Sequence, residues 1–341
     1  MPTVRPCVLT RRGVRHGAFR PTCPPSTPGD VASRFADDLP IHLPGALLPS
    51  LTPERRRSVV QTENLFAKAR SGGGLGAFVT RRLQGSKTLR KTASSVEMFD
   101  TREIEKVYVD EWKAGRRTAR DLYAKLSWIA TDERDVSLRI RFSFGSELLG
   151  DWHRDPRRAA AADRFAEAVF PECRVLTANP SLKRTLKKAF GCELRFSERI
   201  VYANAPGGGA VFHHDAEPTQ LGVLYGQLAG ETAWLALPKR ELAELLVVHG
   251  ARGKLGGRLK TVARAMKALN DPDDDALGRL LNETPAFTRM LVDRNALVVL
   301  RPGDAFVLPS HDVEHCCWHA VFAPGRKPSL AHSYGVFAAR P

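Results

Sequence analysis

The sequence lacks the features that mark membrane proteins and disulfide-rich proteins. No stretch approaches the roughly 18 consecutive apolar residues of a membrane-spanning helix, so we expect neither membrane segments nor a membrane partner. Six cysteines occur without any CxxC spacing, and two of them, Cys316 and Cys317, are adjacent. This pattern argues against a zinc ribbon or a disulfide framework. It predicts reduced thiols in a cytoplasmic enzyme.

Acidic residues are scarce relative to basic ones. The chain has 52 Lys and Arg against 37 Asp and Glu, a formal net charge of +15. Such an excess favours an anionic partner, and an acidic protein or a nucleic acid is the expected substrate class. With 341 residues, 43% of them hydrophobic, the chain can bury the core of one large domain or two small ones.

The first 45 residues are rich in Pro, Arg and Thr and hold too few apolar residues to fold alone. We predict that residues 1–45 form a disordered basic tail whose removal leaves the fold intact. A nucleic-acid-binding arm and an organelle-targeting sequence are the alternatives. The glycine-rich stretch 71–78, SGGGLGAF, lacks the GK[ST] ending of a phosphate loop and is interpreted as a linker.

Residues 46–195 are predicted to be a helical and β support region that packs on the following domain. Residues 107–128, VYVDEWKAGRRTARDLYAKLSW, are interpreted as a helix. In residues 137–145, SLRIRFSFG, apolar and polar residues alternate, which predicts a strand. A second helix should begin after Asn179 with Pro180 in its first turn and end at Gly191.

Residues 196–341 contain eight short apolar segments punctuated by Gly or Pro, which predict eight strands. They are RIVYANAP, AVFHHDAE, QLGVLYGQLAG, TAWLALP, ALVVLRPG, DAFVLPS, WHAVF and LAHSYGVF. A helical insert at about 240–289 separates the fourth from the fifth. The expected fold is mainly β with helical additions (α+β): a double-stranded β-helix, the jelly-roll barrel of the cupins, preceded by N-terminal helices.

The segment FHHDAE suggests a metal site. Alternate residues of a strand share a face, so His213 and Asp215 should point into the barrel and His214 away from it. An imidazole and a carboxylate side by side supply two of the three ligands in the 2-His-1-carboxylate triad that holds Fe(II).

The third ligand should come about 100 residues downstream, from RPGDAFVLPSHDVEHCCWHAVFAPG. His311 directly follows a predicted strand and is interpreted as a loop residue. His319 opens the segment WHAVF and leaves a compact connection to the last strand, so we favour it. His315 remains the alternative distal ligand.

The order HxD, Gly230 and Pro238 around TAWLALP, PGDAFVLP and a late histidine resembles the JmjC and cupin-like Fe(II)/2-oxoglutarate oxygenases, the asparaginyl-hydroxylase type in particular. The resemblance covers about residues 195–338. It implies Fe(II) held by His213, Asp215 and His319, with 2-oxoglutarate as co-substrate and molecular oxygen as oxidant. It further implies hydroxylation of a protein or another substrate, or demethylation through hydroxylation, with no catalytic side chain besides the ligands.

One position departs from the pattern of this family. Many members place a lysine two residues after the glycine equivalent to Gly230, where it binds the distal carboxylate of 2-oxoglutarate, and here that residue is Thr232. A hydroxyl cannot supply a charge-assisted hydrogen bond. Arg199 or Lys239 is expected to provide the cation. The remaining residues expected to bind the co-substrate are Tyr202, Tyr225 and Ser333.

Two other classes of function remain open from the sequence. The barrel could belong to a metal-binding cupin enzyme that does not use 2-oxoglutarate, which the presence of Thr232 favours. The chain could instead be a basic nucleic-acid-associated binding protein with an inert barrel. Metal-dependent activity would distinguish either enzyme from the binding protein, and release of succinate would distinguish the two enzymes.

Overall fold

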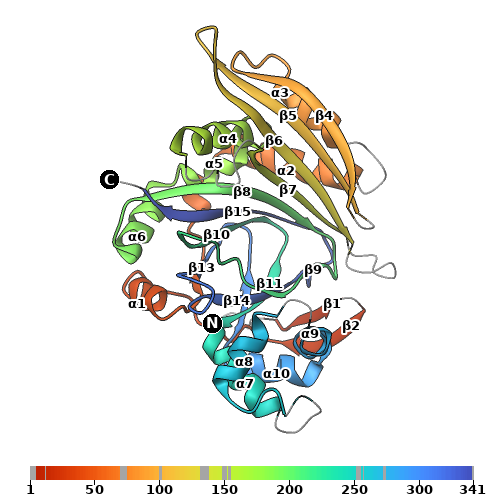
Figure 1. The fold of residues 1–341 in the computed structure, drawn as a ribbon, viewed down its shortest axis with the longest axis vertical. Helices are drawn as coiled ribbons and strands as arrows, with labels where there is room; N and C mark the ends of the chain where they lie inside the picture. The colour runs from red at the N-terminus through yellow and green to blue at the C-terminus, as the bar shows by residue number, and fades with distance from the viewer. Residues whose placement is uncertain are drawn as a thin grey trace.

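Two antiparallel sheets organise the protein (Figure 1). The computed structural model describes residues 5–11, 13–69, 75–99, 102–130, 138–147, 152, 155–250, 255, 257–271 and 274–339. Helices cover the outer faces of the sheets, so the architecture is α+β and mainly antiparallel β, as the sequence predicts. Among the described residues, no helix is long and apolar enough to cross a membrane.

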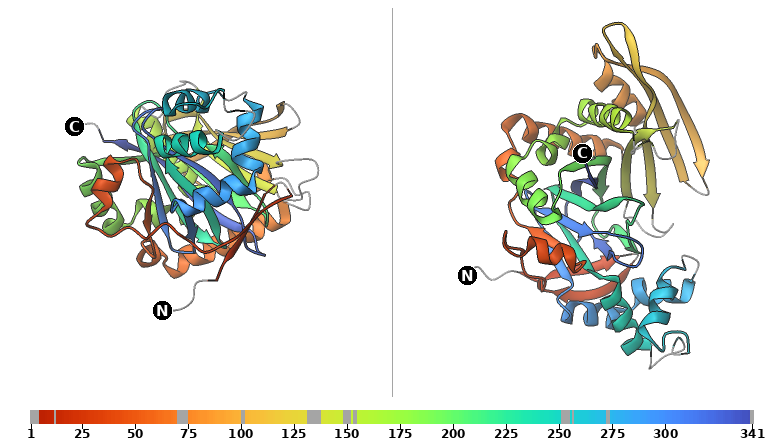
Figure 2. Two further views of the ribbon diagram at one scale, coloured as in Figure 1. Left: turned by 90° about the horizontal axis from the view of Figure 1, so that it is seen from below. Right: turned by 60° about the vertical axis from the view of Figure 1, so that its left-hand side comes forward.

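The larger sheet has nine strands in the order β3-β13-β10-β15-β8-β7-β6-β5-β4. Half of it is a meander of consecutive strands, which extends beyond the rest of the molecule (Figure 2). The bounds are β3 (Ile41–Leu43), β4 (Leu89–Phe99), β5 (Arg102–Lys113), β6 (Arg116–Ala130), β7 (Leu138–Ser146), β8 (Leu194–Asn204), β10 (Gln220–Ala229), β13 (Ala305–Pro309) and β15 (Ser329–Ala338).

The smaller sheet has four strands in the order β12-β11-β14-β9. Their bounds are β9 (Gly209–His213), β11 (Thr232–Pro238), β12 (Leu297–Leu300) and β14 (Cys317–Phe322). It faces β8, β10, β13 and β15, and a buried apolar cluster that includes Tyr225, Trp234, Phe306 and Val321 lies between the two sheets. All eight strands predicted from residues 196–341 are present, β8 to β15.

The helices form two groups on opposite sides of this β-sandwich. One group packs its apolar side chains on the outer face of the larger sheet. It comprises α1 (Val31–Ala36), α2 (Pro53–Ala69), α3 (Leu75–Leu83), α4 (Pro156–Val169), α5 (Arg174–Thr177) and α6 (Pro180–Phe190), with the 3₁₀ turns η1 (Leu48–Ser50) and η3 (Pro171–Cys173). Helix α6 begins and ends as predicted: Leu182 N donates to the Asn179 side chain, and Gly191 adopts a φ of 70°.

The second group of helices covers the smaller sheet. It comprises α7 (Lys239–Gly250), α8 (Val262–Leu269), α9 (Asp275–Glu283) and α10 (Pro285–Asp293), in the stretch for which we expected a helical insert. Leu242, Leu281 and Phe287 of these helices pack with Leu235 of β11 and Phe322 of β14. The insert and the N-terminal hairpin lie together at the bottom of Figure 1.

The predicted helix at residues 107–128 is wrong. These residues belong to β5 and β6, joined by a tight turn in which Ala114 and Gly115 have φ angles of 47° and 76°. This turn conformation suits hairpins. Val107 and Val109 on one strand, and Leu122 on the next, are buried at a period of two, so burial of one sheet face decides the structure.

The prediction that residues 1–45 are disordered is also wrong for the described part of that segment. Residues 7–19 form a hairpin of β1 (Cys7–Arg11) and β2 (Val14–Phe19), and β3 pairs with β13 at the edge of the larger sheet. Arg11 and His16 are almost fully buried. The polar composition suggested a solvated tail, but these polar side chains have specific buried partners.

A buried polar cluster fixes the helices to the larger sheet. Glu172 accepts hydrogen bonds from Ser58 Oγ (2.5 Å) and Thr62 Oγ1 (2.7 Å) of α2 and lies 3.6 Å from His332 Nε2 on β15. Burial opposes the charge on this histidine, but Cys173 and Glu172 raise the pKa of His332 to about 9. The support region and the sandwich therefore share a buried ion pair.

Candidate metal centre

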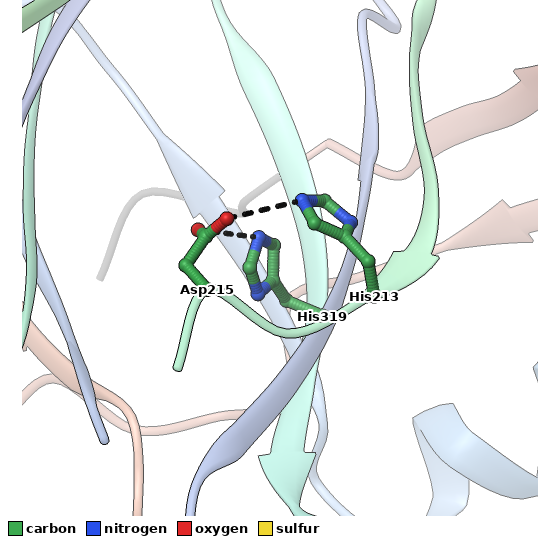
Figure 3. A group of neighbouring side chains, drawn as sticks. All are labelled: His213, Asp215 and His319. Carbon is green, nitrogen blue, oxygen red and sulfur yellow. Dashed lines mark ion pairs between the residues drawn. The ribbon is translucent and has the colours of Figure 1, made fainter. Parts of the chain in front are cut away.

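The side chains of His213, Asp215 and His319 point toward one another (Figure 3) and line a cavity between the two sheets. One possible ligand atom from each of the three lies within 4.8 Å of the others. His213 Nε2 is 3.6 Å from Asp215 Oδ1, and His319 Nε2 is 3.5 Å from Asp215 Oδ2. His213 and His319 are cross-strand neighbours on β9 and β14, which brings their ring centroids to 4.2 Å.

Both imidazoles can offer a ring nitrogen to a metal. His213 Nδ1 lies 2.7 Å from the carbonyl oxygen of Val211, so Nδ1 carries the proton and Nε2 presents its lone pair to Asp215. Burial and then the neighbouring His213 lower the pKa of His319 to about 3, so its ring is neutral. The His319 side chain is 3% exposed, whereas His213 is 39% exposed, so the site opens on the side of His213.

Asp215 reaches the site by a different route from the one predicted. Strand β9 ends at His213, and Asp215 lies in the irregular segment that follows, so strand alternation does not orient it. The Gln220 side chain donates a hydrogen bond of 2.9 Å to the Asp215 carbonyl and holds this segment. Although burial opposes ionisation, His213 and His319 lower the pKa of Asp215 below its ordinary value, which keeps it a carboxylate.

The other histidines near the motifs lie elsewhere. The ring of His214 packs against Trp318 with a centroid distance of 5.3 Å, on the side away from the three converging residues. His315, the alternative distal ligand, is 69% exposed and contacts Asp312 at 3.1 Å. The structure therefore groups His319, and neither His214 nor His315, with His213 and Asp215.

A glycine before His213 permits the close pairing of β9 with β14. Gly209 has a φ of 142°, and a Cβ atom at this position would lie 1.9 Å from the carbonyl oxygen of Val321. A larger residue would push β9 away from β14 and separate the two histidines.

A cavity adjoins the three residues between the sheets. Three of the six residues expected to bind the co-substrate line it, namely Tyr202, Tyr225 and Ser333. The rest of its wall comprises the three converging residues together with Arg139, Asn204, Ala210, Val223, Trp234, Leu308 and Val321. The cavity thus combines possible metal ligands, hydroxyl groups and an arginine.

The other three expected residues use their polar groups elsewhere. Thr232 is fully buried, donates to Gln227 Oε1 (2.7 Å) and accepts from Trp234 Nε1 (2.9 Å), and does not line the cavity. Lys239 Nζ donates to Asn270, Val313 and Glu314 beneath the smaller sheet. Arg199 borders a wider cleft, but its guanidinium pairs with Asp163 (2.8 Å) and Glu167 (3.0 Å) of α4.

Sequence reasoning missed Arg139, the cation that does line the cavity. Its Nη1 donates to the Gly209 carbonyl at 3.3 Å, and its guanidinium lies 5.7 Å from the Tyr202 ring centroid. Nε has no hydrogen-bond partner, and no carboxylate of the described residues pairs with it. The signal was present in SLRIRFSFG, because Ile140 and Phe142 face the helices and the polar residues between them face the sandwich.

A wider cleft of about 520 Å³ borders His213 and Asp215 and runs along β7 and β8. Arg141, Ser143 and Gln220 lie in its wall, as do Glu198 and Glu217. Burial, together with Glu217 and Asp215, raises the pKa of Glu198 to about 7. The cleft therefore presents both a cation and titratable carboxylates to whatever enters it.

Comparison with solved structures finds neighbours of low similarity. An oxidoreductase of the 2OG-Fe(II) oxygenase family from Burkholderia pseudomallei is 10% identical, with a TM-score of 0.32 and 92% of each chain covered. YcfD, a ribosomal oxygenase from Escherichia coli, is 14% identical, with a TM-score of 0.27, and the match covers 79% of this chain and 44% of that one. No protein-family model and no curated protein matches the sequence.

Proposed function

We propose that the protein is an Fe(II)- and 2-oxoglutarate-dependent dioxygenase that hydroxylates its substrate. The observation that carries this proposal is one cavity lined by two imidazoles, a carboxylate and a half-buried arginine that forms no ion pair with a carboxylate of the described residues. The first three residues suit a divalent metal, and the arginine suits an anionic ligand beside it.

The fold proposed for this enzyme is a double-stranded β-helix. In chain order, β8, β10, β13 and β15 belong to the larger sheet, while β9, β11, β12 and β14 belong to the smaller one. This distribution, with the pairing orders β13-β10-β15-β8 and β12-β11-β14-β9, supports a jelly-roll barrel. The metal centre lies at the end of that barrel where β9 and β14 bring their histidines together.

The ligand set fits Fe(II). Ligands at about 2.0–2.2 Å from a metal and at right angles to each other lie roughly 3 Å apart. The observed separations of 3.6 Å and 3.5 Å need only small side-chain movements to reach this spacing. Bound Fe(II) and 2-oxoglutarate would supply oxygen-dependent decarboxylation to succinate, coupled to hydroxylation of a substrate C–H bond.

Arg139 is the proposed anchor for the distal carboxylate of 2-oxoglutarate, in place of the residues predicted from sequence. Its guanidinium can donate charge-assisted hydrogen bonds inside the cavity, where burial strengthens them. Ser333 and Tyr225 line the same wall and can add neutral hydrogen bonds. The co-substrate would then span from the metal to β7.

The cleft along β7 and β8 is the proposed entry path for the primary substrate. It borders His213 and Asp215, which are the exposed side of the centre. The net charge of +15 favours an acidic protein or a nucleic acid as substrate. Demethylation through hydroxylation would use the same geometry.

An anaerobic titration tests this proposal. The purified protein is titrated with Fe(II) in the presence and absence of 2-oxoglutarate, and the visible charge-transfer band of the chelate is monitored. We expect the band only when both are present, and slow release of succinate once oxygen and ascorbate are added. Asp215→Ala is the matched control and should give neither signal.

Two results would contradict the proposal at different levels. Metal binding without the band or succinate would refute the use of 2-oxoglutarate and favour a metal-dependent enzyme of another class. A failure to bind Fe(II), Co(II) or Mn(II) in the micromolar range would refute the metal centre and favour a binding protein with an inert barrel.

A further inference from the structure

Strand β9 carries His213 but lies at the edge of its sheet. It pairs with β14 on one side, and no strand of the described residues pairs with it on the other. An edge strand leaves backbone N–H and C=O groups without strand partners, and buried groups of this kind are costly to leave unpaired. Phe212 and Ala210 of β9 are both buried.

Two side chains from distant parts of the sequence satisfy this edge. Asn282 Oδ1, from α9, accepts a 2.8 Å hydrogen bond from Phe212 N. Arg11 Nη1, from β1, donates a 2.7 Å hydrogen bond to the Ala210 carbonyl. Arg11 Nη2 also donates to Asn282 Oδ1 at 2.8 Å, so the two side chains form one unit, the edge clamp.

The edge clamp is rigidly held. Asn282 Nδ2 donates to the Gly278 carbonyl within α9 (2.9 Å), which fixes the orientation of its amide. The Arg11 guanidinium lies 4.6 Å from the ring centroid of Phe322, and only 1% of Arg11 is exposed. The hairpin and the insert thus act together on one strand.

We propose that Arg11 and Asn282 are positioning residues for the metal centre, an inference that rests on the proposed function. The residues they hold, Ala210 and Phe212, flank Val211, whose carbonyl oxygen accepts a hydrogen bond from His213 Nδ1. Moving this stretch of backbone changes both the place of His213 and the tautomer that presents Nε2 to the metal. Neither Arg11 nor Asn282 lines the cavity or the wider cleft beside the three converging residues.

Metal affinity is the first readout. Mutations of residues that orient metal ligands weaken metal binding by about 10–100-fold. We expect Asn282→Ala and Arg11→Met to raise the dissociation constant for Co(II), followed by its visible absorption, at least tenfold. Asn282→Asp retains acceptors for Phe212 N and Arg11 but loses the donor to the Gly278 carbonyl, so its dissociation constant for Co(II) should lie between those of the unmodified protein and Asn282→Ala.

A matched control separates positioning from general loosening. His16 of the same hairpin contacts Thr288 Oγ1 of α10 at 2.7 Å, and its ring packs against Phe322 of β14. Thr288→Val should lower the unfolding temperature but leave the affinity for Co(II) unchanged. Equal loss of affinity in Thr288→Val and Asn282→Ala would refute the proposal, as would unchanged affinity in Asn282→Ala and Arg11→Met.

The tautomer of His213 provides a readout that does not need a metal. Nitrogen-15 NMR of the histidine-labelled, metal-free protein should show a single Nδ1–H tautomer for His213, and the same in Thr288→Val. Asn282→Ala, or Arg11→Lys if the alanine variant does not fold, should show a mixture of tautomers. If the unmodified protein bound no metal while these tautomers differed, the proposed function would fail and the edge clamp would stand. A single His213 tautomer in every variant would refute the positioning role of the edge clamp.

Discussion

Replacing Arg139 with methionine tests whether its guanidinium binds the distal carboxylate of 2-oxoglutarate. Methionine fills similar space but removes the charge, and a hydrogen bond to a charged group contributes about 1.5–3 kcal/mol. At 1.4 kcal/mol for each factor of ten, the dissociation constant for 2-oxoglutarate should rise about 10- to 150-fold. The single hydrogen bond from Arg139 to β9 is long, at 3.3 Å, so Fe(II) affinity should change little.

The assay is the anaerobic titration of the Fe(II) protein with 2-oxoglutarate, read from the visible band. Arg139→Lys should recover part of the affinity because it keeps the charge but loses the planar fork. Thr232→Val is the matched control. It leaves Gln227 Oε1 and Trp234 Nε1 without their hydrogen bonds to the Thr232 hydroxyl, so it should lower the free energy of unfolding by about 1–3 kcal/mol without altering 2-oxoglutarate binding. Wild-type affinity in Arg139→Met, or an equal loss in Thr232→Val, would show that Arg139 is not the anchor.

Three further predictions concern the ligands, the buried ion pair and the N-terminal segment. His213→Ala should abolish tight Fe(II) binding in a calorimetric titration, whereas His214→Ala should retain it because that ring packs on Trp318. The pKa of His332 is about 9 instead of 6.5, so its ion pair should add about 3 kcal/mol to the free energy of unfolding. This contribution should be fully present below pH 6.5 and lost as the pH rises past 9. Denaturant unfolding at several pH values should show this loss in the unmodified protein and not in His332→Gln. Deleting residues 1–45 should lower the unfolding temperature and weaken Co(II) binding, and wild-type values in the shortened protein would contradict the role of Arg11.

The eight strands of the sandwich were predictable because burial on both faces makes them short, apolar and sharply bounded by Gly or Pro. The same local signals failed at residues 107–128. The charged residues of β5 and β6 do not alternate strictly with apolar ones, so their pattern in the sequence also fits the solvent-exposed face of a helix. Only pairing with β7 and packing on helices decide that these residues are extended.

The histidines of the candidate site could be predicted from the sequence, but the cation that lines the cavity could not. His213 and His319 could be found because few histidines fit the strand pattern. The cation could not be placed, because any strand around the cavity could supply it. Arg199 and Arg139 both lie on strands of the larger sheet, but Arg199 pairs with α4 while Arg139 faces the cavity, and the sequence alone does not reveal which face is covered by helices.

The position of β15 has a consequence for how the chain folds during synthesis. This strand lies between β8 and β10 in the larger sheet, although Ser329 at its start follows the end of β8 by 125 positions and the end of β10 by 100. The meander from β4 to β7 contains contacts that are local in sequence and can form as it leaves the ribosome. The edges of β8 and β10 that face each other stay unpaired until β15 emerges between them. A nascent chain stalled before β15 would therefore expose two unpaired strand edges that can pair with other chains. A chaperone would act on the chain at this stage of synthesis.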